Sequence, residues 1–260
     1  MVNEDGEPLQ QRDYISSLAK GLDVLRAFSK EYPRLSTTEL AGRLDISRAS
    51  ARRFLLTLAN LGYLRKEGQW FQPTSKVLSL SSVFFSSTPL ATIAAPYLDE
   101  GTRLIEESCS LGILEHNMLV FIAHSPSHWL LKLEIRNGTR IPAHISAMGR
   151  NMLASLPAAE LTRYLDATEL KAFTDRTITS KARLRAVLAQ VKAQRYAVID
   201  QELEQGLRSI AVPVVQNGNV VAAFGVASHV SRTTLRRMER EFLPVMRDLA
   251  ARISAEISRL

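Results

Sequence analysis

The sequence predicts an α+β protein of two domains, a winged helix-turn-helix followed by a larger domain of helices and strands. First, 260 residues are more than a single winged helix needs. Second, residues 35–72 show two short helices joined by a tight turn and followed by a hairpin pattern. Third, strand-like apolar runs alternate with amphipathic helices after residue 89, which favours an antiparallel or mixed sheet.

The composition is that of an ordinary globular protein, with 46% hydrophobic and 23% charged residues. A net charge of +7 favours a polyanionic partner. The single cysteine, Cys109, excludes an intramolecular disulfide and a cysteine-rich zinc site. The polar start and the lack of a long apolar stretch predict a soluble cytoplasmic protein without a membrane span.

The clearest break in composition is the Ser-, Thr- and Pro-rich stretch at residues 86–89, where we place a domain boundary. The predicted segments are a flexible tail at 1–13, a winged helix-turn-helix at 14–73, a linker helix at 74–88 and a second domain at 89–260.

Local signals define the helices of the first domain. A first helix is predicted over 17–29, where leucines and a phenylalanine recur at helical spacing. Ser36 followed by Glu39 is a capping box that starts the second helix. Ser47 is the predicted N-cap of the third helix, and Gly62 marks its end. A wing follows, with strands at 63–65 and 70–72 joined by a four-residue turn that contains Gly68.

The third helix has one apolar face, predicted at Ala51, Phe54, Leu55, Leu58 and Leu61. Its opposite face is small, basic and hydroxyl-bearing, so it can enter a major groove of double-stranded DNA. The predicted DNA contacts are Ser36, Thr37, Ser47, Arg48, Ala49, Ser50, Arg52, Arg53 and Thr57, with Lys66 and Gln69 on the wing. One alternative is that these are solvated charges on an ordinary surface helix. Another is a protein-interaction module in which the helix pair serves only dimerisation.

The second domain is predicted to mix both kinds of element. The predicted helices are 90–107, 146–156, 158–165, 181–195 and a long one from 233 to the C-terminus. The predicted strands are 111–123, 129–135, 209–215 and 220–227, the last two joined by a Gln-Asn-Gly-Asn turn.

Four stretches match a known family: SLAKGLDVLRAFS, LSTTELAGRLDISRASARRFLLTLANLGYL, RIPAHISAMGRNMLAS and QELEQGLRSIAVPVVQNGNVVAAFGVAS. They resemble the IclR family of bacterial transcription regulators across nearly the whole chain. YISSLAKGLDVL and PTSKVLSL are most similar to the PcaR/PcaU/PobR subgroup, which controls protocatechuate and 4-hydroxybenzoate catabolism. Where such families often show Thr-Gly-Glu-Thr, this chain has Glu-Ser-Cys-Ser at 107–110.

The resemblance implies a regulator that binds palindromic operators as a homodimer or homotetramer, with Arg53 at the recognition-helix arginine of the family. It also implies that the second domain is GAF-like and binds a small effector. For the subgroup, this effector is a carboxylate of the protocatechuate, 4-hydroxybenzoate or β-ketoadipate class. An IclR-type regulator of a different carbon source is the alternative.

The start of the predicted helix at 146–156 can hold a carboxylate through free backbone N–H groups, without any charged side chain. With the residues carried over from the family pocket, the predicted effector contacts are Leu130, Leu133, Ala147, Met148, Gly149, Asp200, Glu202, Leu207, Ser209, Gly225 and Ala227. Arg208 either pairs with the effector or forms an ion pair with Glu202 or Glu204.

An enzyme is not predicted, because no G-x-S-x-G elbow, P-loop, G-x-G-x-x-G or H-E-x-x-H motif occurs. We expect no cofactor and no resident metal, although a metal held across strands by His116, His124 or His144 stays an alternative. Cys109 is interpreted as a buried apolar residue and not as a redox sensor.

Overall fold

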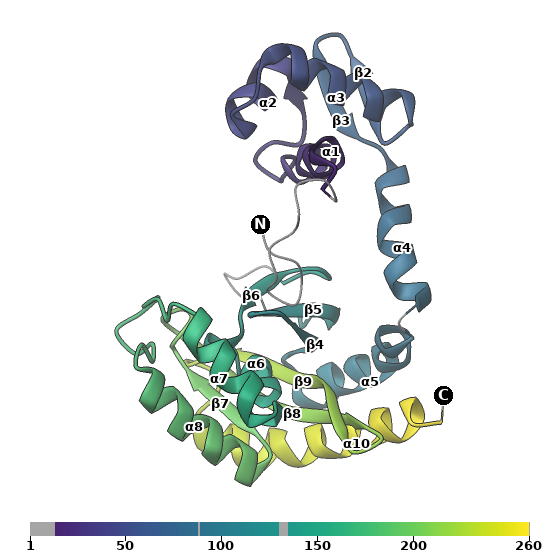
Figure 1. Ribbon diagram of the computed structural model, residues 1–260. Coiled ribbons are helices and arrows are strands. Elements are labelled where there is room, and N and C mark those ends of the chain that lie inside the picture. The colour runs from purple at the N-terminus through teal and green to yellow at the C-terminus, as the bar shows by residue number, and fades with distance from the viewer. Residues whose placement is uncertain (1–13, 88, 130–134, 260) are drawn as a thin grey trace. The chain divides into compact units, whose positions relative to one another are not determined.

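The computed structural model describes residues 14–87, 89–129 and 135–259 (Figure 1). The chain separates into two compact units between Thr88 and Pro89, here called the N-terminal and the C-terminal unit. Within the described ranges, no helix is both long and apolar enough to cross a membrane.

Three helices form the body of the N-terminal unit: α1 (Ser16–Arg26), α2 (Thr37–Leu44) and α3 (Arg48–Asn60). The predicted capping box is confirmed, since Ser36 Oγ accepts from Glu39 N while the Glu39 carboxylate accepts from Ser36 N at 2.8 Å. The predicted N-cap of α3 is confirmed as well, because Ser47 Oγ accepts from Ser50 N at 3.1 Å. Asp45 ends α2 in the left-handed conformation, with φ at 49°.

The wing is a three-stranded antiparallel sheet in the order β1 (Leu35–Ser36), β3 (Trp70–Pro73), β2 (Leu64–Glu67). Its turn is tighter than predicted, because Lys66 and Glu67 pair with β3 and only Gly68 and Gln69 remain between the strands. Gly68 adopts φ +60°, which suits glycine in a two-residue hairpin turn. The strand β1 was not predicted, since two residues carry no periodic signal.

Side chains from all three helices and the wing bury the core of this unit: Val24, Ala27, Leu35, Leu40, Ala41, Ala51, Leu55, Leu58, Leu64 and Phe71. Leu61 was predicted to lie on this apolar face, but it is 52% exposed. It follows the last turn of α3 as the C-cap residue, where the helical rotation that places the others inside has ended. After the wing, a short 3₁₀ turn at Ser75–Val77 leads into the linker helix α4 (Leu78–Ser87).

A six-stranded antiparallel sheet forms the centre of the C-terminal unit, in the order β6-β5-β4-β9-β8-β7. The strands are β4 (Ser108–Glu115), β5 (Met118–Ser125), β6 (Arg140–Pro142), β7 (Ala197–Asp200), β8 (Leu207–Gln216) and β9 (Asn219–His229). The hairpin predicted between the last two strands is confirmed, with Gln216 paired to Asn219.

One strand prediction in this unit needs correction, and two short strands were missed. The single strand predicted at 111–123 is the hairpin β4–β5, which turns at His116 with φ 54°. A His-Asn turn lacks the glycine that usually marks a hairpin, so apolar residues on both sides merged into one run. The strands β6 and β7 are too short to be recognised from periodicity. The predicted strand at 129–135 falls mostly outside the described residues.

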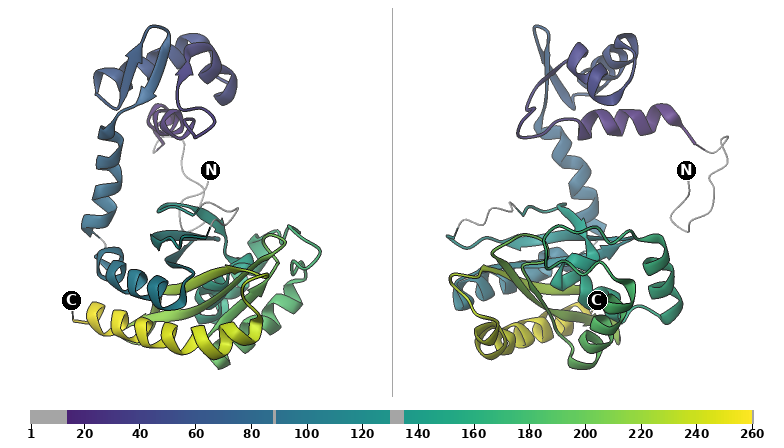
Figure 2. Two further views of the ribbon diagram at one scale, coloured as in Figure 1. Left: turned by 180° about the vertical axis from the view of Figure 1, so that it is seen from behind. Right: turned by 90° about the vertical axis from the view of Figure 1, so that its left-hand side faces the viewer.

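Helices cover both faces of this sheet (Figure 2). One face carries α5 (Leu90–Ile105) and α10 (Leu243–Ile257), and the other carries α6 (Ala147–Ser155), with α7 (Ala158–Ala167) and α8 (Lys181–Gln194) beyond it. Phe224 of β9 lies against Gly101 of α5, whereas its neighbour Gly225 lies against Met148 of α6. This alternation places consecutive residues of β9 on opposite faces. The long terminal helix was predicted as continuous, but α9 (Leu235–Arg237) and a π-helical turn at Met238–Phe242 precede α10.

Candidate functional site

The outer face of α3 is basic and exposed. Arg48, Arg52 and Arg53 all lie on it, whereas Ala51 and Leu55 face the core. Among the described residues, no carboxylate lies within ion-pair distance of these three arginines. Three guanidinium groups are therefore available for phosphates or base edges, the two kinds of DNA contact that arginine makes best.

The hydroxyl groups predicted to contact DNA beside these arginines form hydrogen bonds with residues close to them in the sequence. Ser47 Oγ and Ser50 Oγ lie 2.9 Å apart, and Thr57 Oγ1 donates to the Arg53 carbonyl at 2.8 Å. Ser36 Oγ donates to the Glu39 carboxylate at 2.8 Å. Each hydroxyl therefore stabilises a helix end or a helical turn, and its contact with DNA remains a prediction.

The other predicted DNA contacts are placed around α3. Thr37, the first residue of α2, is half-buried, while Ala49 is exposed on the outer face of α3. On the wing, Lys66 is exposed with its Nζ 6.0 Å from the centre of the Phe71 ring. Gln69 is exposed in the wing turn. The structure thus presents α3 and the wing as surface elements of one small domain.

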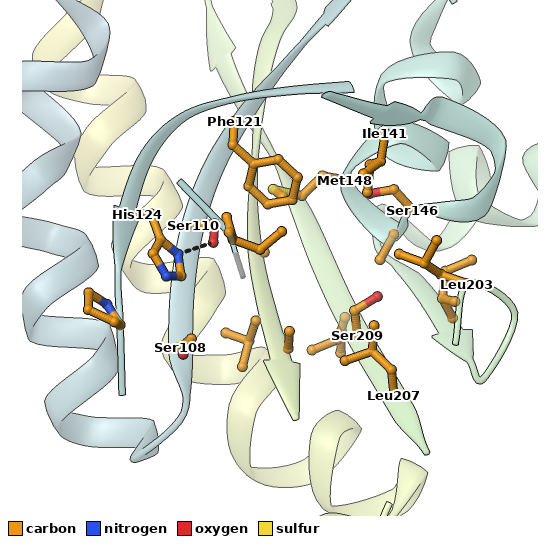
Figure 3. A pocket seen from close by; sticks show the side chains of 18 of the residues that line it. Ser108, Ser110, Phe121, His124, Ile141, Ser146, Met148, Leu203, Leu207 and Ser209 are labelled. Atoms are coloured by element: carbon orange, nitrogen blue, oxygen red, sulfur yellow. Dashed lines mark hydrogen bonds between the residues drawn. The ribbon is translucent and has the colours of Figure 1, made fainter. Parts of the chain in front are cut away.

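In the C-terminal unit, a cavity of about 380 Å³ opens on the face of the sheet that carries α6 (Figure 3). It is lined by Ser108, Ser110, Phe121, His124, Pro126, Ser127, Trp129, Ile135, Arg136, Ile141, Ile145, Ser146, Ala147, Met148, Ile199, Leu203, Leu207, Ser209, Ile210, Gly225, Val226 and Ala227. The size is within the range of about 300–1,000 Å³ that is usual for small-molecule sites.

Polar groups lie at two sides of this cavity, with apolar groups between them. Ser110 and His124 lie on one side and Ser146 and Ser209 on the other, while Phe121 projects between the two sides (Figure 3). Ser110 Oγ lies 2.9 Å from His124 Nδ1. Burial lowers the pKa of His124, so its imidazole is neutral near pH 7 and can hydrogen-bond an uncharged hydroxyl.

The N-terminal end of α6 forms part of the wall. Ser146 caps the helix, with its Oγ accepting from Gly149 N at 3.3 Å. Within the described part of the chain, the N–H groups of Ala147 and Met148 donate to no acceptor, as expected in the first turn of a helix. Because both residues line the cavity, this end of α6 suits an anionic group.

The charges of the described lining residues also suit an anionic ligand. Arg136 lines the cavity, and no aspartate or glutamate occurs among the described lining residues. The arrangement therefore suits a small acid with an apolar body and a polar group at its far end.

Comparisons with known proteins match both units of the chain. Residues 17–68 match the IclR helix-turn-helix domain, and residues 83–255 match the C-terminal domain of bacterial transcriptional regulator IclR. The chain belongs to the IclR family. This family consists of transcriptional regulators, so the predictions of a DNA-binding regulator and of a chain that is not an enzyme are confirmed.

Two curated relatives are regulators. The Pca regulon regulatory protein of Pseudomonas putida is 41% identical over 236 residues, 90% of this chain and 81% of that protein. The p-hydroxybenzoate hydroxylase transcriptional activator of Acinetobacter baylyi is 33% identical over 250 residues, 94% of this chain and 92% of that protein. The crystal structure of RHA06195 from Rhodococcus sp. RHA1 has 37% identity and a TM-score of 0.87, covering 95% of this chain and 99% of that chain. The predicted fold class is confirmed.

The structure brings part of the predicted effector site of this IclR-family chain together. The predicted residues that line the cavity are Ala147, Met148, Leu207, Ser209, Gly225 and Ala227. Leu130 and Leu133 lie outside the described residues. Gly149 is buried away from the cavity, where a Cβ would come within 2.6 Å of the Ala143 Cα. Its role is close packing of α6 on the preceding turn.

Glu202 and Asp200 do not reach the cavity, and both form ion pairs instead. Glu202 accepts from Arg150 Nη1 at 2.8 Å and Nη2 at 2.6 Å, in a buried pair. Asp200 accepts from Arg208 Nε and Arg176 Nη1, each at 2.6 Å. Burial alone would raise the pKa of Asp200, but the hydrogen bonds from Arg208 and Gln201 outweigh it and lower that pKa. Arg208 thus pairs with Asp200, whereas the sequence predicted the effector, Glu202 or Glu204 as its partner.

Sequence reasoning missed the polar side of the cavity. Ser108 and Ser110 alternate on β4, and His124 comes from β5. The alternation was detectable, but the strand predicted from residue 111 began after both serines. The described residues contain no group of three or more His, Cys, Asp or Glu side chains able to hold a metal ion. Burial raises the pKa of the Cys109 thiol to about 12, which makes it unreactive.

Proposed function

We propose that this IclR-family regulator binds an aromatic hydroxy acid of the 4-hydroxybenzoate or protocatechuate class and controls genes for the catabolism of such acids. The observation that carries the proposal is the cavity itself, which has polar groups on two opposite sides, an apolar middle and no acidic residue among its described lining. The names of the Pseudomonas and Acinetobacter relatives support it.

Each part of such an acid has a matching part of the wall. The carboxylate is placed at the N-terminal end of α6, where the N–H groups of Ala147 and Met148 and the helix dipole favour an anion. The ring lies beside Phe121. The hydroxyl group of the acid reaches the pair formed by Ser110 and His124. An aliphatic diacid such as β-ketoadipate would instead bring a second carboxylate to these neutral groups.

The response to the effector arises from a change in the arrangement of the chains in a homodimer. A homodimer presents two α3 helices to successive major grooves of a palindromic operator, about one helical turn of DNA apart. An effector that binds one arrangement of the C-terminal units better than another shifts the population of arrangements and so the spacing of the recognition helices. Within the chain, α4 is the covalent connection through which this shift is transmitted.

Thermal unfolding and isothermal titration of the full chain with 4-hydroxybenzoate, protocatechuate, benzoate and β-ketoadipate test the proposal. We expect both hydroxybenzoates to raise the Tm, since a ligand of the native state at 100 times its Kd stabilises by about 2.7 kcal/mol. His124→Phe keeps a ring but loses the hydrogen bond, so 4-hydroxybenzoate should bind it roughly tenfold more weakly while benzoate changes little.

Benzoate serves as the internal control for the shape of the cavity in the variant. If neither hydroxybenzoate binds the wild-type chain while another acid does, the proposed effector class is wrong, although the family membership still stands.

A further inference from the structure

Trp129 lines the effector cavity and is contacted by a side chain from a distant part of the chain. Trp129 is 45% exposed, and the ring of its neighbour His128 is tilted against the indole with ring centres 4.5 Å apart. The second contact comes from far along the chain, because the guanidinium of Arg232 lies over the indole with Cζ 5.1 Å from its centre. An Arg over an aromatic face is a stabilising contact.

Arg232 is itself held by a buried carboxylate. Its Nε and Nη2 donate to Glu107 Oε1 and Oε2, both at 2.9 Å, and the Glu107 side chain is only 5% exposed. Glu107 Oε1 also accepts from Ser228 Oγ at 2.7 Å, and Ser228 Oγ bonds to Thr233 at 2.8 Å. The guanidinium plane is thus fixed by its edge, which leaves its face for the indole.

This cluster adjoins the polar side of the cavity. Glu107 directly precedes Ser108, and Ser108 Oγ accepts from Ser127 N at 3.0 Å. Both serines line the cavity, as does Trp129 two residues further on. Three segments therefore meet here, namely the start of β4, the end of β5 with the residues that follow it, and the residues after β9.

We propose that Arg232 is a positioning residue that fixes Trp129 as an aromatic wall of the effector cavity, so that affinity for aromatic acids depends on a residue that does not line it. The inference rests on the proposed function for the identity of the ligand. The buried bidentate pair with Glu107 orients Arg232, and Arg232 orients the indole. A held indole can stack on or meet the edge of a benzoate ring, a geometry that a freely rotating side chain would lose.

Isothermal titration of the full chain with 4-hydroxybenzoate and with 6-hydroxyhexanoate measures this dependence. Trp129→Ala should weaken 4-hydroxybenzoate binding roughly tenfold, and Arg232→Lys, which keeps a cation against Glu107, about fivefold. The double variant should bind no more weakly than Trp129→Ala alone, because both changes remove one wall. The affinity for 6-hydroxyhexanoate, which has a carboxylate and a hydroxyl group but no ring, should change by less than about twofold.

Arg252→Lys is the matched control. Arg252 also combines an ion pair, with Glu100 at 2.9 Å, and a ring contact, with its Cζ 4.9 Å from the centre of the Tyr97 ring, but it does not line the cavity. Its replacement should leave both affinities unchanged.

A spectroscopic readout separates positioning from stability. The chain has two tryptophans, so protein labelled with 5-fluorotryptophan gives two ¹⁹F resonances, and Trp129→Phe assigns them. Without any ligand, Arg232→Lys should shift and broaden the Trp129 resonance and leave that of Trp70 in place. Arg252→Lys should move neither resonance.

The proposed function and the positioning role of Arg232 can be disproved independently of each other. If neither 4-hydroxybenzoate nor protocatechuate binds the wild-type chain, the proposed function fails, while the ¹⁹F comparison without ligand still tests the positioning. If Arg232→Lys lowers the Tm but alters neither the Trp129 resonance nor the affinity, Arg232 serves the fold alone and the inference is overturned. Additive losses of affinity in the double variant would overturn it as well.

Discussion

The two units hold their predicted functional residues in opposite ways. In the N-terminal unit, the three arginines of α3 are exposed and lack an ion-pair partner among the described residues. In the C-terminal unit, both acidic residues predicted to bind the effector form ion pairs outside the cavity. A charge on the outside of an amphipathic helix is free to bind a partner, whereas a charge inside a domain must first be neutralised.

The contrast is sharpest at Glu202, where the largest effect is expected. Glu202→Gln keeps the shape but leaves the buried Arg150 guanidinium without its counter-charge. Removing one partner of such a buried ion pair lowers the free energy of unfolding by about 3–5 kcal/mol. The free energy of unfolding, from urea melts of the full chain, should fall by that amount.

Glu169→Gln is the matched control, because Glu169 is 79% exposed and pairs at 3.6 Å with the exposed Lys171. Its effect should stay below about 1 kcal/mol. A Glu202→Gln chain of unchanged stability but weakened 4-hydroxybenzoate binding would show that Glu202 contacts the effector after all.

Arg53→Ala tests the opposite assignment in the N-terminal unit. Since the exposed Arg53 side chain has no described partner, its loss should leave the Tm and effector binding unchanged. Loss of a base contact should weaken specific operator binding by about 1–3 kcal/mol, roughly fivefold to 150-fold. Fluorescence anisotropy with an operator duplex and a scrambled duplex measures this.

Arg163→Ala provides the control, because it removes one exposed arginine of α7 and so changes the net charge equally. An equal loss in both variants, or an equal loss on both duplexes, would mean that Arg53 acts only through charge.

Ser36→Ala is expected to have the smallest effect and refines the comparison within the N-terminal unit. Ser36 was predicted to contact DNA, yet its hydroxyl caps α2 and bonds to Glu39. Loss of an N-cap costs about 1 kcal/mol, so the stability of the unit should fall by that amount. Operator affinity of the folded protein should change by less than about twofold. A tenfold loss of affinity with unchanged stability would instead place Ser36 on the DNA.

How well the sequence predicted each feature depends on how far apart in the chain the interacting residues lie. The capping box at Ser36 and Glu39 and the hairpin turn at Gly218 depend on residues close together in the chain, and both were predicted. The cavity depends on pairing between β4 and β9, which are more than a hundred residues apart in sequence. No local pattern reports such pairing, so even the detectable alternation of Ser108 and Ser110 could not show that Ser110 faces a cavity.

The buried ion pairs show the same limit for charged residues. A glutamate in a loop-like stretch has the same local appearance whether it binds a ligand or pairs inside the fold, as Glu202 does with Arg150. Likewise, nothing near Trp129 in the sequence indicates Arg232, which reaches it from beyond β9. Only packing of distant segments decides these partners.

By itself the sequence determined the family, the α+β class, the helix caps and the exposed basic face of α3, because these depend on local spacing and on motifs. The tertiary structure alone decided which side chains line the cavity, which charges are neutralised inside the fold and what supports Trp129. The physical reason is that burial and the pairing of charges are properties of segments brought together by folding, whereas amphipathic spacing and helix caps already exist within a few consecutive residues.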